Sequence, residues 1–146
     1  MGLDGDQTLL LVGVTPSLAQ VLGAYIGNKF RIIAINREFS LEELESYSNL
    51  QLILIDTDQF QVKIPELMKT LRMDSKYRDI PTIGLALRQH FAKMSPELKV
   101  QFEDIILMPC SNEDLLTRID VWIMTFRTIQ SHVDAKSYAL DSLHVD

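Results

Sequence analysis

Five short apolar runs, separated by segments of helical character, constrain this chain more than any other feature of its sequence. Each run is too apolar for a strand with one solvent-facing side, a pattern typical of strands buried on both faces of a sheet. The runs are residues 8–13, 30–35, 50–56, 81–86 and 104–108. We therefore expect a five-stranded sheet.

Helix signals lie between the apolar runs. Capping side chains precede the helical segments, in two cases followed by proline and in two by an acidic residue three positions on. These starts are Thr15 before Pro16, Ser40 before Glu43, Pro65 itself, Ser95 before Pro96, and Ser111 before Asp114. The alternation predicts a (βα)5 α/β fold, a doubly wound parallel sheet with helices on both faces. Functional residues of such sheets follow the carboxyl ends of the strands.

Composition narrows the class further. The chain has 146 residues, enough for one domain with its own core. Its net charge of -6 argues against a nucleic-acid binder, and its single cysteine, Cys110, excludes an internal disulfide framework and a multi-cysteine metal site. Because we find neither a signal peptide nor an apolar stretch of about 18 residues, we expect a cytoplasmic protein without a membrane segment.

Four segments carry a resemblance to a known family. They are LLLVGVTPSL at 9–18, LQLILID at 50–56, LRMDSKYRDIPTI at 71–83 and EDIILMPCSNEDLL at 103–116. Together they resemble the receiver domain of bacterial response regulators, over roughly residues 7–128. The resemblance implies the flavodoxin-like fold and identifies Asp56 as the position of the phosphoacceptor aspartate.

The same resemblance shows what this chain lacks. An active receiver holds Mg²⁺ with an acid pair after its first strand, and carries a hydroxyl after the fourth strand and a lysine after the fifth. The metal and the lysine neutralise the phosphoryl oxygens during transfer. The corresponding residues here are Gly13 and Val14 for the acid pair, Ala86 for the hydroxyl, Met108 for the lysine, and Ile105 for the aromatic switch residue of the fifth strand.

We therefore predict a pseudo-receiver, with Asp56 a remnant, the domain not an enzyme, and no cofactor. Val14, Ala86 and Met108 are expected to pack against one another rather than to form a ligand pocket. One alternative is a working phosphorelay receiver, phosphorylated on Asp56 by a histidine kinase, with Asp58 and Mg²⁺ completing the site. Another is a nucleotide- or flavin-binding domain using residues 13–17, although these match no glycine-rich phosphate loop.

The segment after residue 128 has a pattern of its own. Apolar residues at 4-3-4-3 spacing are typical of a short coiled coil, here Ile129, Val133, Leu140 and Leu143, with Lys136 as a flaw. A frayed tail is the alternative, because the pattern is shorter than three heptads. Residues 139–146 resemble the stretch that precedes GGDEF-type diguanylate cyclase domains. We expect residues 7–128 to form the domain and residues 129–146 a helical linker toward an output domain.

We further predict a homodimer formed through the last helices and the face between about residues 96 and 126. The residues expected on this interaction face are Lys99, Asp104, Ile105, Arg118 and Trp122. Cys110 is interpreted as an inert thiol rather than a redox sensor. The remaining residues assigned no role are His90, His132 and His144, together with Arg78, Arg88 and Lys93 on solvated surfaces.

Overall fold

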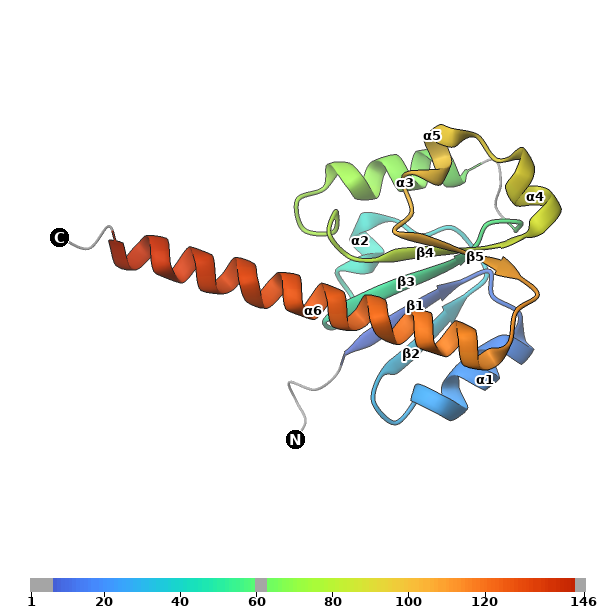
Figure 1. Cartoon of the computed structure of the whole chain (residues 1–146), viewed down its shortest axis with the longest axis horizontal. Helices are drawn as coiled ribbons and strands as arrows, with labels where there is room; N and C mark the ends of the chain where they lie inside the picture. The colour runs from blue at the N-terminus through green and yellow to red at the C-terminus, as the bar shows by residue number, and fades with distance from the viewer. Residues whose placement is uncertain (1–6, 60–62, 144–146) are drawn as a thin grey trace.

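The computed structural model describes residues 7–59 and 63–143, the last part, 130–143, by its backbone alone. All five strands lie in one parallel sheet in the order β2-β1-β3-β4-β5 (Figure 1). The strands are β1 (Thr8–Val12), β2 (Arg31–Ile35), β3 (Leu50–Asp56), β4 (Thr82–Leu87) and β5 (Asp104–Met108). The predicted α/β class and the parallel sheet are confirmed.

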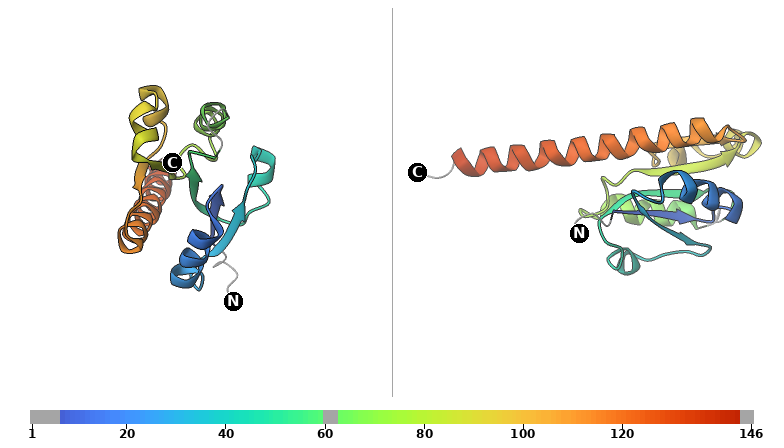
Figure 2. Two further views of the ribbon diagram at one scale, coloured as in Figure 1. Left: turned by 90° about the vertical axis from the view of Figure 1, so that its right-hand side faces the viewer. Right: turned by 90° about the horizontal axis from the view of Figure 1, so that it is seen from below.

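Helices cover both faces of this sheet (Figure 2). On one face lie α1 (Pro16–Ile26) and α6 (Asn112–Leu143). The other face carries α2 (Leu41–Leu44) and α3 (Ile64–Met73), with the short α4 (Arg88–Lys93) and α5 (Pro96–Lys99) beyond them near β4 and β5. Because strand side chains alternate between faces, each layer of helices packs on its own apolar cluster.

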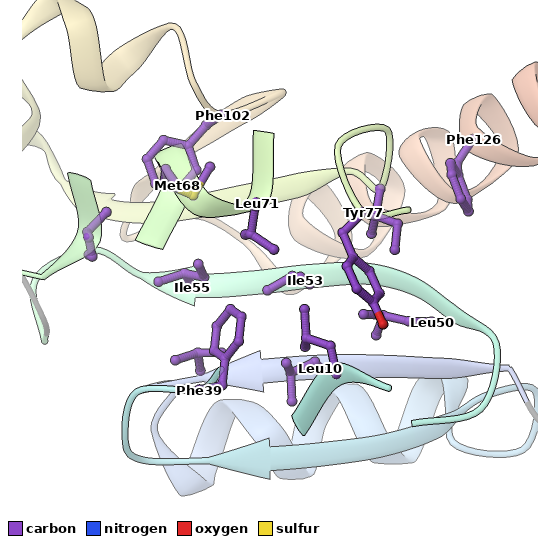
Figure 3. Packing of buried hydrophobic residues seen from close by; sticks show 14 residues of the cluster. Leu10, Phe39, Leu50, Ile53, Ile55, Met68, Leu71, Tyr77, Phe102 and Phe126 are labelled. Atoms are coloured by element: carbon purple, nitrogen blue, oxygen red, sulfur yellow. The ribbon is translucent and has the colours of Figure 1, made fainter. Parts of the chain in front are cut away.

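The central strands supply both clusters. In β3, Ile53 and Ile55 pack toward α2 and α3, while Leu52 and Leu54 pack toward α1 and α6. Figure 3 shows the first of these clusters, with Met68 and Leu71 of α3 and Phe39 arranged around the sheet. Leu52, Ile53, Leu54 and Ile55 have no exposed surface at all, so this strand anchors the fold.

Four of the five predicted helix starts are confirmed by capping hydrogen bonds, whereas the helix predicted to open at Pro65 begins at Ile64 without a side-chain cap. The Ser40 hydroxyl accepts from the Glu43 backbone N–H at 3.1 Å, and Thr15, Ser95 and Ser111 accept in the same way three residues ahead. Each cap satisfies a backbone donor that the first turn of a helix leaves without a partner.

Two expectations about the elements were wrong. The prediction missed α4, which follows β4 directly. This helix has no capping side chain and buries none of its residues, so the sequence shows neither a cap nor an apolar periodicity there. The strands β2 and β5 are only partly buried, because both lie at the edges of the sheet. An apolar run therefore did not distinguish an edge strand from a central one.

The last helix continues without a break from Asn112 to Leu143. Figure 1 shows its second half projecting well past the sheet. The frayed-tail alternative is not what the backbone adopts, at least as far as residue 143. No helix within residues 7–59 and 63–143 combines the length and the apolar character needed to cross a bilayer.

Candidate functional site

A cleft of about 430 Å³ opens at the carboxyl ends of the strands. The strand ends bring together side chains that are far apart in sequence, as the parallel topology requires. Its lining includes Val14, Asp56, Ala86 and Met108, four of the five positions at which the resemblance places receiver chemistry. The fifth, Gly13, is buried at the end of β1 and lines a neighbouring groove with Val14 and Thr15.

Gly13 has a backbone φ of 73°, in the left-handed region that favours glycine. Its N–H donates to the Ile35 carbonyl at 2.9 Å, which fixes this conformation at the end of the strand. Glycine adopts this conformation without cost, and among other residues aspartate and asparagine tolerate it best.

Asp56 is half-buried at the edge of the cleft, and one of its carboxylate oxygens, Oδ1, accepts the Asp58 backbone N–H at 2.9 Å. Burial raises the pKa of Asp56, the charge of Asp58 adds to that rise, and the N–H bond opposes it. Neither lysine nor arginine is among the residues that line the described cleft. A cationic side chain of this kind is what a phosphoryl-transfer site places beside its acceptor.

Asp58 is already engaged within the chain. Its Oδ1 lies 2.8 Å from Nδ1 of His90, and its Oδ2 accepts the Leu87 backbone N–H at 3.2 Å. The carboxylate therefore ties the loop after β3 to the start of α4. Its use as a second ligand for a metal beside Asp56, the role given to it in the phosphorelay alternative, would compete with these two contacts.

Sequence reasoning missed His90, which had been assigned no role. Its neighbourhood follows from topology, since Asp58 comes two residues after β3, His90 lies three after β4, and these strands are adjacent. The proximity of Asp58 and His90 could therefore have been predicted from the order of the strands, but only if helix α4 had been recognised. Across the described parts of the chain, no group of three or more His, Cys, Asp or Glu side chains has the arrangement of a metal site.

Apolar side chains occupy the positions at which the resemblance expects a hydroxyl and a lysine. Ala86 is 1% exposed, and Met108 is half-buried with its Sδ 3.6 Å from Sγ of Cys110. Burial, with Asp114 nearby, raises the pKa of the Cys110 thiol. A protonated thiol is a poor nucleophile, which agrees with an inert cysteine.

The residues of the expected interaction face lie on α5, β5 and α6, and several of them make contacts within the chain. Asp104 accepts two bonds from the Arg118 guanidinium, Nε at 3.0 Å and Nη2 at 2.5 Å, and a third from Trp122 Nε1 at 3.2 Å. Lys99 Nζ lies 4.2 Å from the centre of the Phe91 ring. Lys99, Asp104 and Arg118 are therefore partly buried by contacts within the chain.

The other residues noted from the sequence have simple positions. Ile105 is half-buried and packs against the α3 side of the core. Arg78, Arg88 and Lys93 are exposed. The side chains of His132 and His144 lie outside the described residues.

Solved structures identify the fold that this arrangement shares. One described as an adenylate cyclase from Rhodopirellula baltica matches with a TM-score of 0.69 and 18% identity, over 90% of this chain and 98% of that one. A response regulator from Desulfuromonas acetoxidans matches at 0.63 and 22%, over 82% and 98%. A receiver-modulated diguanylate cyclase from Pelobacter carbinolicus matches at 0.62 and 17%, over 86% and 98%.

At these identities the likeness establishes the fold. The chain has the receiver-domain fold of response regulators, as the resemblance in the sequence implied. No protein-family model matches the sequence, and no curated protein matches it.

Proposed function

We propose that this domain is a non-catalytic pseudo-receiver, which transmits signals through protein contacts and no longer through phosphorylation. The observation that supports the proposal is the lining of the cleft around Asp56. Val14, Ala86 and Met108 replace a metal ligand, a hydroxyl and a cation with apolar groups. Asp58, the nearest other carboxylate, is engaged by His90 and Leu87.

Replacing these three groups should greatly slow phosphoryl transfer to Asp56. Phosphoryl transfer depends almost entirely on positioning and on charge stabilisation of the transferring group. Removing a single donor of this kind costs on the order of 10²–10³ in rate in enzymes where it has been measured. Three such groups are absent together, and although their effects are not additive, the combined loss is large.

Magnesium binding tests the first requirement of the phosphorylation chemistry. Isothermal titration of the wild-type protein with MgCl2 at millimolar concentrations should show no saturable binding. The Val14→Asp variant, which adds a carboxylate beside Asp56 and leaves the constrained Gly13 in place, should gain a measurable site. Saturable Mg²⁺ binding by the wild type that disappears in Asp56→Asn would contradict the proposal.

The second part of the proposal concerns dimerisation through α6. The 4-3 spacing of the tail continues backward through Phe126, Trp122, Ile119 and Leu115, which pack on the domain. Beyond the sheet, the same helix continues to Leu143 (Figure 1). A helix of about fifteen residues is marginal alone in water, so a partner helix would stabilise this projecting segment.

The edge of the sheet gives this dimer a consistent geometry. Since β5 is an edge strand, the face formed by α5, β5 and α6 borders unpaired backbone groups. Ile129, which is 45% exposed, lies on the same side of α6 as Trp122 and nearer to the tail. A twofold contact over this face would align the two tails.

Sedimentation equilibrium tests the dimer directly. The wild-type chain should associate, and Ile129→Lys should shift it toward monomer. The matched control is Val121→Lys, also exposed on α6 but away from the predicted seam. A monomeric wild type at high micromolar concentration, or equal effects of the two substitutions, would contradict a dimer formed by this seam.

We further propose that α6 leads to an output domain, a diguanylate cyclase being favoured. Support comes from the residues at 139–146 and from the similar fold of the receiver-modulated diguanylate cyclase of Pelobacter carbinolicus. If α6 is the linker, inserting two residues after position 128 should disrupt control of cyclase activity in the full-length protein. Inserting seven, one heptad, should preserve it.

The phosphorelay alternative retains one supporting observation. Asp56 lines the cleft and is only half-buried, so a small phosphodonor reaches it from solvent. A histidine kinase partner and a Mg²⁺ requirement belong to this alternative alone.

A further inference from the structure

A second pocket lies at the opposite edge of the sheet, where the strands begin. It has a volume of about 620 Å³, which is within the range of small-molecule sites. Buried apolar side chains form part of its lining: Leu44, Leu50, Ile80 and Phe126. Phe126 belongs to α6 at the point where the helix passes the edge of the sheet (Figures 1 and 3).

Two buried polar groups in this pocket have unmet hydrogen-bonding capacity. Gln51 is 5% exposed and Tyr77 is 4% exposed, yet Gln51 Oε1 and the Tyr77 hydroxyl have no hydrogen-bond partner in the described part of the chain. The Gln51 amide is oriented by its Nε2, which donates to Asn49 Oδ1 at 2.9 Å, so Oε1 is the atom left over. Buried polar groups are rarely left in this state.

The geometry around Tyr77 connects these atoms to the pocket. Figure 3 shows its hydroxyl end close to Leu50, and both residues line the pocket. An acceptor and a hydroxyl without partners, set beside an apolar wall, fit a ligand that brings its own hydrogen-bond donor. Reaching the two oxygens takes side-chain rotations of the kind that commonly accompany binding.

The exposed rim of the pocket carries an excess of positive charge. The rim has two basic side chains, Lys76 and Arg127, and one acidic side chain, Glu45. None of the three takes part in an ion pair within the described residues. Arg127 donates to the Gln7 side chain and lies over the Phe30 ring, which holds its guanidinium at the rim. An anionic group at one end of a ligand would therefore be favoured there.

We propose that this pocket binds a small aromatic carboxylate that carries a hydroxyl or N–H donor at its far end. The ring would pack against Leu50 and Phe126, the donor would meet Gln51 Oε1, and the carboxylate would lie near Arg127. The site shares no lining residue with the cleft around Asp56, so it stands or falls independently of the pseudo-receiver proposal.

Titration of the whole isotopically labelled chain, followed by amide NMR, tests the proposal with 4-hydroxybenzoate as the probe. Saturable shifts should centre on Gln51 and Tyr77, with a dissociation constant of about 1 mM or tighter, as expected for a ligand of this size. Benzoate lacks the donor and 4-hydroxybenzamide lacks the charge, and each should bind about fivefold more weakly.

Two substitutions and one control complete the experiment. Gln51→Met removes the acceptor, and Tyr77→Phe removes only the hydroxyl; each should weaken 4-hydroxybenzoate severalfold. Tyr25→Phe, the same change at a residue 63% exposed on α1, should leave binding unchanged. If one pocket variant does not fold, the other decides. The proposal is overturned by the absence of saturable shifts, by equal binding of the three probes, or by binding that survives these substitutions.

Discussion

The contacts of Asp104 with α6 should stabilise the fold of a single chain, independently of any dimer. Asp104 begins the edge strand β5, and its carboxylate accepts from Arg118 twice and from Trp122 once. Substituting Asp104→Asn keeps the size of the side chain and removes its charge. If these contacts fasten α6 to β5, the variant loses stability as a monomer.

The magnitude follows from exposure. A hydrogen bond to a buried charged group contributes about 1.5–3 kcal/mol, and a fully exposed ion pair about 0–1 kcal/mol. Here the side chains are 43% exposed for Arg118 and 21% for Asp104, between those limits. After discounting for solvent screening, we expect Asp104→Asn to lower the free energy of unfolding by about 1–2 kcal/mol. For a chain of this length that lowers Tm by roughly 3–6 °C.

A double-mutant cycle with Arg118→Gln isolates the pair. Urea unfolding should be measured at two protein concentrations, because association also stabilises a folded chain. The coupling energy between the two substitutions should be about 1 kcal/mol at the lower concentration. The Arg37–Glu43 pair, with side chains 61% and 19% exposed, offers a second doubly hydrogen-bonded pair for comparison. Additivity within about 0.3 kcal/mol would refute the intrachain role of Asp104.

Other predictions concern single positions. Gly84→Ala should destabilise the folded protein by about 1–3 kcal/mol, since the added Cβ would lie 2.9 Å from Thr57 Cγ2. Gly23→Ala, at an exposed position of α1, should stabilise it by about 0.5–1 kcal/mol. Thermal unfolding of both variants measures these changes. The hydrogen bond from Arg37, and then that from Tyr47, lowers the pKa of Glu43. The stability that ionised Glu43 contributes to the fold is therefore complete above pH 4.5 and is lost as the pH falls through the lowered pKa. In Glu43→Gln, the free energy of unfolding should depend less on pH in this acid range. Burial raises the pKa of Asp56, so the folded state binds its proton more tightly; Asp56→Asn should be more stable than wild type at pH 7, with the difference vanishing below pH 3.8.

Much of the fold was predictable because local signals and topology agreed. The apolar run at 50–56 and the Ser40–Glu43 cap each needed only neighbouring residues to be read. By contrast, α4 buries nothing and lacks a capping side chain, so no short-range pattern marked it. The edge positions of β2 and β5 depend on strand order, which an apolar run does not encode.

The candidate site divides in the same way. That Val14, Asp56, Ala86 and Met108 meet at one edge of the sheet was predictable, because parallel strands end there. That Val14, Ala86 and Met108 line a cleft was not predicted, since they were expected to pack against one another. The engagement of Asp58 by His90 depended on an unpredicted helix. The Asp104–Arg118 contact depended on how α6 lies on β5, since fourteen residues of sequence separate the two side chains.

The central claim is that Asp56 no longer takes part in a phosphorylation switch. Its most direct test is intact-mass spectrometry of the wild-type chain after incubation with acetyl phosphate and Mg²⁺, with Asp56→Asn and an active receiver alongside. We predict no phosphate adduct under conditions that label the active receiver. A Mg²⁺-dependent adduct on the wild type that is absent from Asp56→Asn would contradict the account and establish Asp56 as a working phosphoacceptor.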